Sequence, residues 1–385
     1  MRSRPFRQRM RQSAAVARLA LGLALLTTGA AFSQTAGDEL RSEYGDLGTL
    51  LDAAWLAQAR TFEAIIGIDG SPAASEARER FAESLRMRAN MSMADMMVMM
   101  RMPGGMEMLG PYDELEFPAS NELMESLLST HSRREVRNAY EDSSLPARAV
   151  EVLRRGHQFE TRVFDILVAE SVRDRPAALA AAVDAYLVES LSVPARPKPA
   201  ALLLAHAHAG AFVEGFPRLS GIAWSSLWLR LAAMEAIIFE QRGASDWGSV
   251  ATVEARFRSK LSDSGQNGSP VPVEMPMAPA IAPTLFSLSP QAAIILDNLN
   301  MLSSIVADVL AYPNLDNKPA RIDALVAEFT NHAGSADPTI DYLVSALRAG
   351  IYNQGGPAVG ELAQSERNRS RMEMGMRHFM IMPVP

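Results

Sequence analysis

Apolar residues recur along most of this chain at steps of three and four, which is the period of an amphipathic α-helix. The pattern is clear at Ile294, Leu299, Leu302, Ile305, Val306 and Val309. It predicts helices over residues 47–66, 72–102, 121–140, 146–172, 175–191, 200–214, 222–242, 250–261, 292–311, 318–332 and 337–349. No run of alternating β-branched residues is long enough for a sheet. The predicted fold class is therefore all-α, a bundle-like body of many helices.

Proline and glycine mark the breaks between the predicted helices. Residues 110–118 are expected to form a loop. Residues 262–290 carry eight of these breakers, namely Gly265, Gly268, Pro270, Pro272, Pro276, Pro279, Pro283 and Pro290. This composition is typical of a linker between an N-terminal helical domain (34–261) and a C-terminal helical region (291–352), or of an irregular segment covering one domain. Both alternatives stay open, and residues 353–385 form a tail.

The first 33 residues have the pattern of an export signal. A basic start with Arg2, Arg4, Arg7, Arg9 and Arg11 precedes a short apolar stretch, and Ala31-Phe32-Ser33 has the small-x-small pattern of a cleavage site. We expect a periplasmic or secreted bacterial protein. No later segment predicts a stable membrane span, since the apolar stretch 221–239 carries Arg230 and Glu235.

Charge and cysteine content narrow the possible chemistry. Without residues 1–33 the chain has 31 basic and 44 acidic residues, a net charge of −13. Phosphate binding needs a basic face, so nucleic acid is excluded as an expected partner. The chain has no cysteine, which excludes disulfides and thiolate metal sites. A site for a soft metal must therefore use methionine, with histidine in support.

The C-terminal tail alternates thioethers with other residues. The members of this series are Met372, Met374, Met376, His378, Met380 and Met382. In an extended strand these side chains leave from one face, and thioether sulfur is a soft donor that favours Cu(I). The tail therefore predicts metal capture, while packing as an added edge strand and disorder without function are the alternatives.

A second methionine cluster occupies residues 87–108, which hold 10 of the 22 methionines. On a helix, Met93, Met96, Met97 and Met100 lie within an arc of about 100°, and Met106 and Met108 follow the glycine turn. Metal binding, adaptable core packing and an oxidant sink are all open here. Five further methionines lie in the tail, so the enrichment is local.

The M-x-M spacing of the tail and the dense 91–108 run resemble exported methionine-rich proteins that handle copper or silver in the bacterial envelope. The resemblance covers about 35 residues and names no family for the helical body. It implies binding of Cu(I) or Ag(I) for tolerance or delivery. The alternative is a non-enzymatic envelope scaffold that docks another envelope protein on methionine surfaces.

Other candidate ligands are histidines near acidic residues. His157 and Glu160 lie at i, i+3, and this segment is similar to the G-x-H-x-x-E element of imelysin-like exported helical proteins, although Gly156 directly precedes His157. An exposed ion pair or a capping contact is the competing expectation there. His206 and His208 would point apart on a helix, and Glu328 with His332 fits a solvated helix face. Catalytic signatures such as G-x-S-x-G, H-E-x-x-H and the P-loop do not occur, so binding is expected rather than catalysis.

Overall fold

The computed structural model describes residues 37–89, 110–243, 248–262, 272, 274–333 and 339–352, with the backbone alone at 88–89 and 348–352. These ranges contain sixteen α-helices and one 3-10 helix, and no strand occurs within them. The predicted all-α class is thus confirmed. The predicted signal (1–33), most of the first methionine cluster and the C-terminal tail lie outside the described residues.

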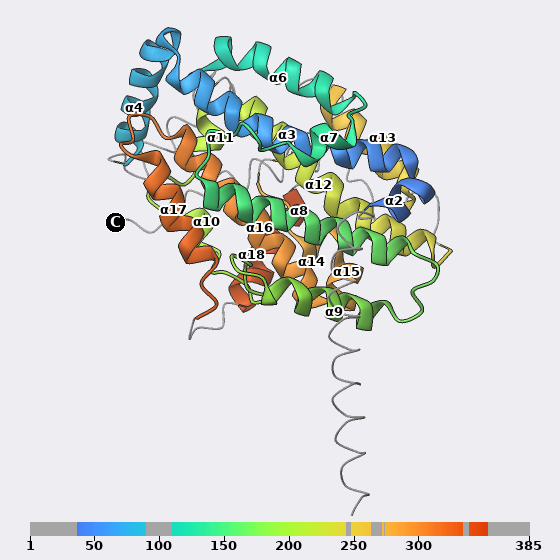
Figure 1. The fold of residues 1–385 in the computed structure, drawn as a ribbon. Coiled ribbons are helices and arrows are strands. Elements are labelled where there is room, and N and C mark those ends of the chain that lie inside the picture. Colours follow the sequence, from blue (N-terminus) through green and yellow to red (C-terminus); the bar gives the residue numbers. More distant parts are fainter. Residues whose placement is uncertain are drawn as a thin grey trace, which may run out of the picture.

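The helices are shown in chain order by colour in Figure 1. Their bounds are α2 Asp38–Glu43, α3 Gly45–Gly70, η1 Pro72–Ala74, α4 Ser75–Ala89, α6 Asp113–Leu127, α7 Arg133–Arg137, α8 Ala147–Val168, α9 Arg175–Val188, α10 Ala201–Leu204, α11 Ala211–Gly215, α12 Pro217–Glu240, α13 Val250–Ser262, α14 Ala278–Ile281, α15 Pro283–Leu288, α16 Pro290–Ala311, α17 Lys318–Phe329 and α18 Thr339–Tyr352. The strongly periodic segments of the sequence, above all α8, α12 and α16, are helical close to the expected bounds.

Three predicted elements differ from the structure. The helix expected over 121–140 is broken, because α6 ends at Leu127 and a capping box of Ser132 and Glu135 begins the separate short helix α7. Residues 113–118 were expected in a loop, yet α6 begins at Asp113 and contains Pro118. The helix buries Leu123 and Leu127, and this apolar burial offsets the one backbone hydrogen bond that a proline removes. The expected helix 200–214 is interrupted between α10 and α11, where Gly210 adopts a left-handed φ of 82° that ends a helical run.

Helices α12 and α16 form the interior of the body. Every residue of α16 from Ala292 to Ala311 is buried, and α12 is buried along most of its length. Helices α3 and α8 pack against both of them (Figure 1). The two central helices are also long and apolar enough to cross a membrane, but nearly all of each lies inside the body, as in the core helices of soluble proteins.

Residues 274–290 belong to this interior. Met275, Met277, Ile281 and Leu285 are all at most 3% exposed, and α14 and α15 pack on α12 and α16. One hydrophobic core runs from Leu40 to Ala346. This part of the Pro/Gly-rich segment therefore covers the central helices, which favours a covering segment over a solvated linker.

Several helices have their N-terminal N–H groups capped by a buried carboxylate that belongs to another helix. The residues that precede α2, α11, α12, α14 and α15 supply no side-chain cap. Their free backbone N–H groups instead donate to a carboxylate on another helix, at 2.8–3.1 Å: Asp165 for α2, Asp308 for α11, Glu116 for α12, Asp297 for α14 and Glu235 for α15. A carboxylate also complements the positive end of the helix dipole. These five contacts fix how the helices are placed relative to each other.

Candidate functional site

The methionine clusters that the sequence singles out lie almost wholly outside the described residues. This holds for Met93, Met96, Met97, Met100, Met106 and Met108, and for Met372, Met374, Met376, His378, Met380 and Met382. The described structure therefore neither brings these side chains together nor separates them. One neighbour is described: Met87, near the end of α4, is 53% exposed. At this edge of the first cluster the thioether is accessible and is not a core side chain.

The described residues contain a polar cavity where α3, α8, α12 and α16 meet. It measures about 20 Å³. Its polar wall consists of Gln58, His157, Glu160, Arg230, Asn300 and Ser303, and its apolar wall includes Trp55, Leu153, Leu231, Leu296 and Leu299. A water molecule needs roughly 10–15 Å³, so the cavity has room for a water molecule or a small ion.

A buried ion pair forms one side of this cavity. The Arg230 Nη1 donates to Glu160 Oε2 at 2.8 Å, and Arg230 Nη2 donates to Asn300 Oδ1 at 3.3 Å. The side chains are only 9% and 11% exposed. Burial raises the pKa of the Glu160 carboxyl, and the charge of Arg230 opposes that shift. The expectation of an exposed ion pair at this position is therefore wrong, because α12 and α8 enclose both charges.

Trp55 holds the imidazole of His157 against the cavity. The two rings stack at 4.1 Å between centroids, with 10° between their planes. Burial, together with the nearby positive charges of Arg230 and Arg41, lowers the pKa of His157 to about 3. The imidazole is therefore neutral throughout the physiological range, with one donor and one acceptor nitrogen.

The cavity does not suit a metal ion. His157 and Glu160 are two possible ligands, and in the described part of the chain no three His, Cys, Asp or Glu side chains form a group that could hold a metal. The guanidinium of Arg230 adds repulsion. The Glu160 carboxylate offsets that repulsion, so the pocket offers a cation no net negative charge. The residues of this pocket thus fit a neutral occupant better than a cation.

His206 and His208 lie closer together than the sequence indicates. The segment between α10 and α11 is not helical, and the two rings are 6.2 Å apart. However, His206 Nε2 pairs with Asp308 Oδ2 at 3.0 Å, while the backbone N–H of His208 donates to His206 Nδ1 at 3.3 Å. Both nitrogens of His206 are therefore occupied, and the pair anchors this loop to α16.

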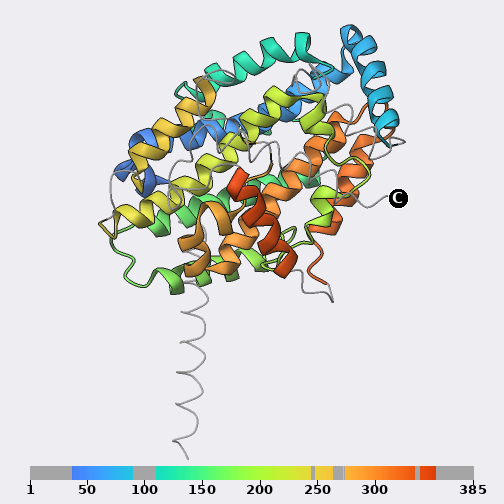
Figure 2. The same ribbon diagram turned by 180° about the vertical axis from the view of Figure 1, so that it is seen from behind.

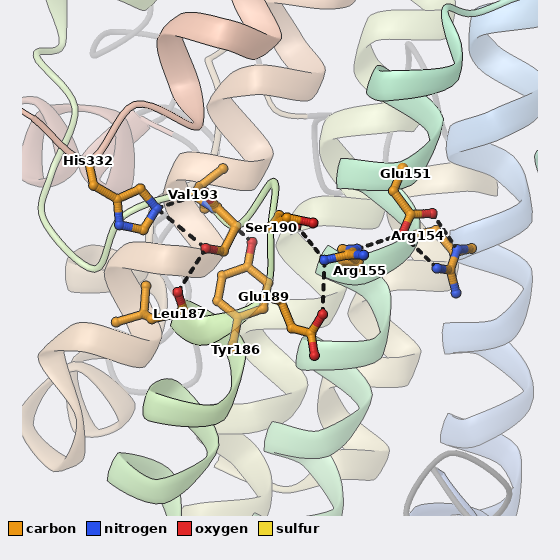
Figure 3. A network of polar contacts seen from close by, with 10 residues as sticks. Glu151, Arg154, Arg155, Tyr186, Leu187, Glu189, Ser190, Val193 and His332 are labelled. Atoms are coloured by element: carbon orange, nitrogen blue, oxygen red, sulfur yellow. Dashed lines mark hydrogen bonds and ion pairs between the residues drawn. The ribbon is translucent and has the colours of Figure 1, made fainter. Parts of the chain in front are cut away.

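The remaining histidines also have structural partners. Helix α17 ends at Phe329, so His332 does not share a helix face with Glu328. Its Nε2 lies 2.9 Å from the carbonyl oxygen of Ser192, in a polar network that ties the end of α9 to α8 (Figure 3). His131 Nε2 lies 2.8 Å from the carbonyl oxygen of Ser126 at the end of α6. Neither imidazole points to a metal site.

Sequence reasoning found His157 and Glu160 but missed Gln58, Arg230, Asn300 and Ser303, which complete the pocket. One signal was present. Arg230 interrupts an otherwise apolar helix, and a charge in such a place requires a buried partner. The partner lies 70 residues away on α8, a distance that no local pattern reveals.

Comparisons with protein-family models, curated proteins and solved structures found no match to this chain. The fold and the pocket therefore define it only as an all-α body around a small cavity with a partly polar wall.

Proposed function

We propose that this protein is an exported binder of Cu(I) or Ag(I), which takes the ion through methionine thioethers in a role of metal tolerance or delivery. The observation that carries the proposal is the concentration of 15 of 22 methionines in residues 87–108 and 372–382. Thioethers are the soft donors that suit these ions, and the chain has no thiolate that would compete.

The use of methionine in the body supports this proposal. Among the described residues, Met234, Met275, Met277 and Met301 are buried in a core built mainly of Leu, Ile, Val, Phe and Ala. Those methionines are scattered over several elements. Met87, by contrast, belongs to the first cluster and is exposed. A cluster that served only as core filling would not be expected to begin with an accessible thioether.

A competition assay tests the proposal. The protein without residues 1–33 would be titrated anaerobically against a coloured Cu(I) chelator. Replacing the five tail methionines by Leu keeps the apolar surface and removes the sulfurs, so the number of bound ions is expected to fall. Thioethers need no deprotonation, so binding should depend weakly on pH, with His378 adding a modest change near neutrality.

A matched control lies in the same segment. Substituting Glu373, Arg377 and Ile381 by Ala changes the alternate positions and leaves every thioether in place, so the stoichiometry is expected to persist. Unchanged copper uptake after Met→Leu replacement in both clusters would refute the proposal.

An envelope scaffold is the second candidate, and one feature of α18 favours it. Ile340, Val344 and Leu347 are 77%, 62% and 55% exposed and lie at i, i+4 and i+7, the spacing by which a helix docks in an apolar groove. The opposite face, with Tyr342 and Ala346, is buried, and α18 packs on α14 at the outside of the body (Figure 2). Docking through this face would survive the Met→Leu replacements, whereas metal binding would not.

A further inference from the structure

Two buried polar atoms in the wall of the central cavity have no hydrogen-bond partner in the described structure. They are Nε of Arg230, a donor, and Oε1 of Gln58, an acceptor. Arg230 is only 7% exposed, and both residues line the same cavity. Leaving a buried polar group without a hydrogen bond is destabilising, so this pair of atoms indicates an occupant.

The neighbouring hydrogen bonds fix which atoms are unpaired. Ser303 Oγ donates to the carbonyl oxygen of Leu299 at 2.9 Å, so it can only accept from Gln58, whose Nε2 lies 2.6 Å away. The Gln58 amide is thereby oriented with Oε1 as the free acceptor. Arg230 in turn uses Nη1 for Glu160 and Nη2 for Asn300, which leaves Nε–H.

Size and charge select among the possible occupants. A cavity of about 20 Å³ admits a water molecule or a monatomic ion. The wall contains one paired positive and one paired negative charge, Arg230 and Glu160, so it offers no net charge to offset a buried ion. An anion would face the oxygen of Gln58, and a cation would face Arg230. A neutral molecule that both donates and accepts satisfies both free atoms.

We propose that one ordered water molecule occupies this cavity, accepting from Arg230 Nε and donating to Gln58 Oε1. Its second hydrogen faces a wall that offers further acceptors, among them the neutral imidazole of His157. The water joins α3 to α12 and completes the hydrogen bonds of the junction of four helices. The site is a permanent structural one and does not depend on metal binding elsewhere in the chain.

A crystal structure of the protein grown in sodium bromide tests this proposal. The expected result is one density peak within hydrogen-bonding distance of both Arg230 Nε and Gln58 Oε1, with no anomalous signal at the bromine edge. A second crystal soaked in rubidium salt should likewise show no anomalous peak there. An anomalous peak in either crystal, or an empty cavity, would overturn the proposal.

Two substitutions make the test specific. Gln58→Leu removes the acceptor and fills part of the space, so the peak should be lost while circular dichroism stays that of the folded protein. The matched control is Gln158→Leu at an exposed position of α8, where the peak should persist. If Gln58→Leu does not fold, the second readout uses the unmodified protein. Water-relaxation dispersion then measures the exchange of a long-lived internal water molecule with bulk water. Absence of such a water would contradict the site.

Discussion

Removing the Glu160 carboxylate alone tests how strongly the ion pair of the central cavity is desolvated. In Glu160→Met the side-chain volume is roughly kept, but the Arg230 guanidinium loses the partner 2.8 Å away and stays almost fully buried. Breaking a buried pair in this way typically costs about 3–5 kcal/mol, because an uncompensated charge remains inside. We expect the free energy of unfolding to fall by about that amount, a large share of the stability of a typical domain.

The double variant Glu160→Met/Arg230→Met separates desolvation from lost packing. Replacing both charges by apolar side chains of similar size is often neutral or stabilising, so the double variant should recover most of the loss. Both variants would be measured by urea unfolding followed by circular dichroism. The control is Glu76→Met, which breaks the exposed 2.6 Å pair with Arg80 and should cost less than about 0.5 kcal/mol.

Two results would refute this reasoning. Either Glu160→Met costs no more than Glu76→Met, or the double variant remains as unstable as the single one. The first would mean that solvent reaches Arg230 and screens its charge. The second would mean that the pair is needed for its shape and hydrogen bonds, including the one to Asn300, and not to neutralise a buried charge.

Three further predictions concern single side chains. Burial raises the pKa of Asp297 to about 7. The contribution of this carboxyl to the free energy of unfolding is therefore fully present below the unfolded pKa near 4 and is lost as pH rises through 7. Relative to Asp297→Asn, the wild type should lose about 1.4 kcal/mol per pH unit in that window. A pH-independent difference between these two chemical denaturation series would contradict this. His157 has the opposite sign, because its pKa is lowered to about 3: relative to His157→Gln, the wild type should lose stability as pH falls from about 6.5 toward 3, and equal acid midpoints would count against a buried neutral imidazole. Finally, a Cβ on Gly156 would lie 2.8 Å from the Leu299 side chain. Gly156→Ala should therefore lower the free energy of unfolding by about 1–3 kcal/mol, and Leu299→Ala should partly rescue it. No effect would mean that α8 can move away from α16.

The sequence predicted those parts of the fold that depend on local information. In α16 the apolar residues Ile294, Leu299, Leu302 and Ile305 follow the helical period, and the buried helix lies where that period predicts it. The helix around Pro118 was missed for a physical reason. A proline is a local penalty of fixed size, whereas the burial of Leu123 and Leu127 and the hydrogen bond of Glu116 with the start of α12 are tertiary gains.

The candidate site was predictable only in part. His157 and Glu160 stand out because they lie one turn apart on a helix. Whether Glu160 faces solvent or Arg230 depends on the packing of α8 against α12, which the spacing does not encode. The methionine clusters differ, since their spacing is evident in the sequence and the metal-binding assay is the test of what they bind.

The remote carboxylate caps have a consequence for how the chain can be divided. Helices α14 and α15 sit in the Pro/Gly-rich segment, yet the groups that complete their first turns are Asp297 of α16 and Glu235 of α12. The Pro/Gly-rich segment is thus capped by one carboxylate from the part of the chain before it and by one from the part after it. Expressed separately, the two halves should fail to form independent native folds, whereas the same two halves expressed together should associate and unfold in a single transition.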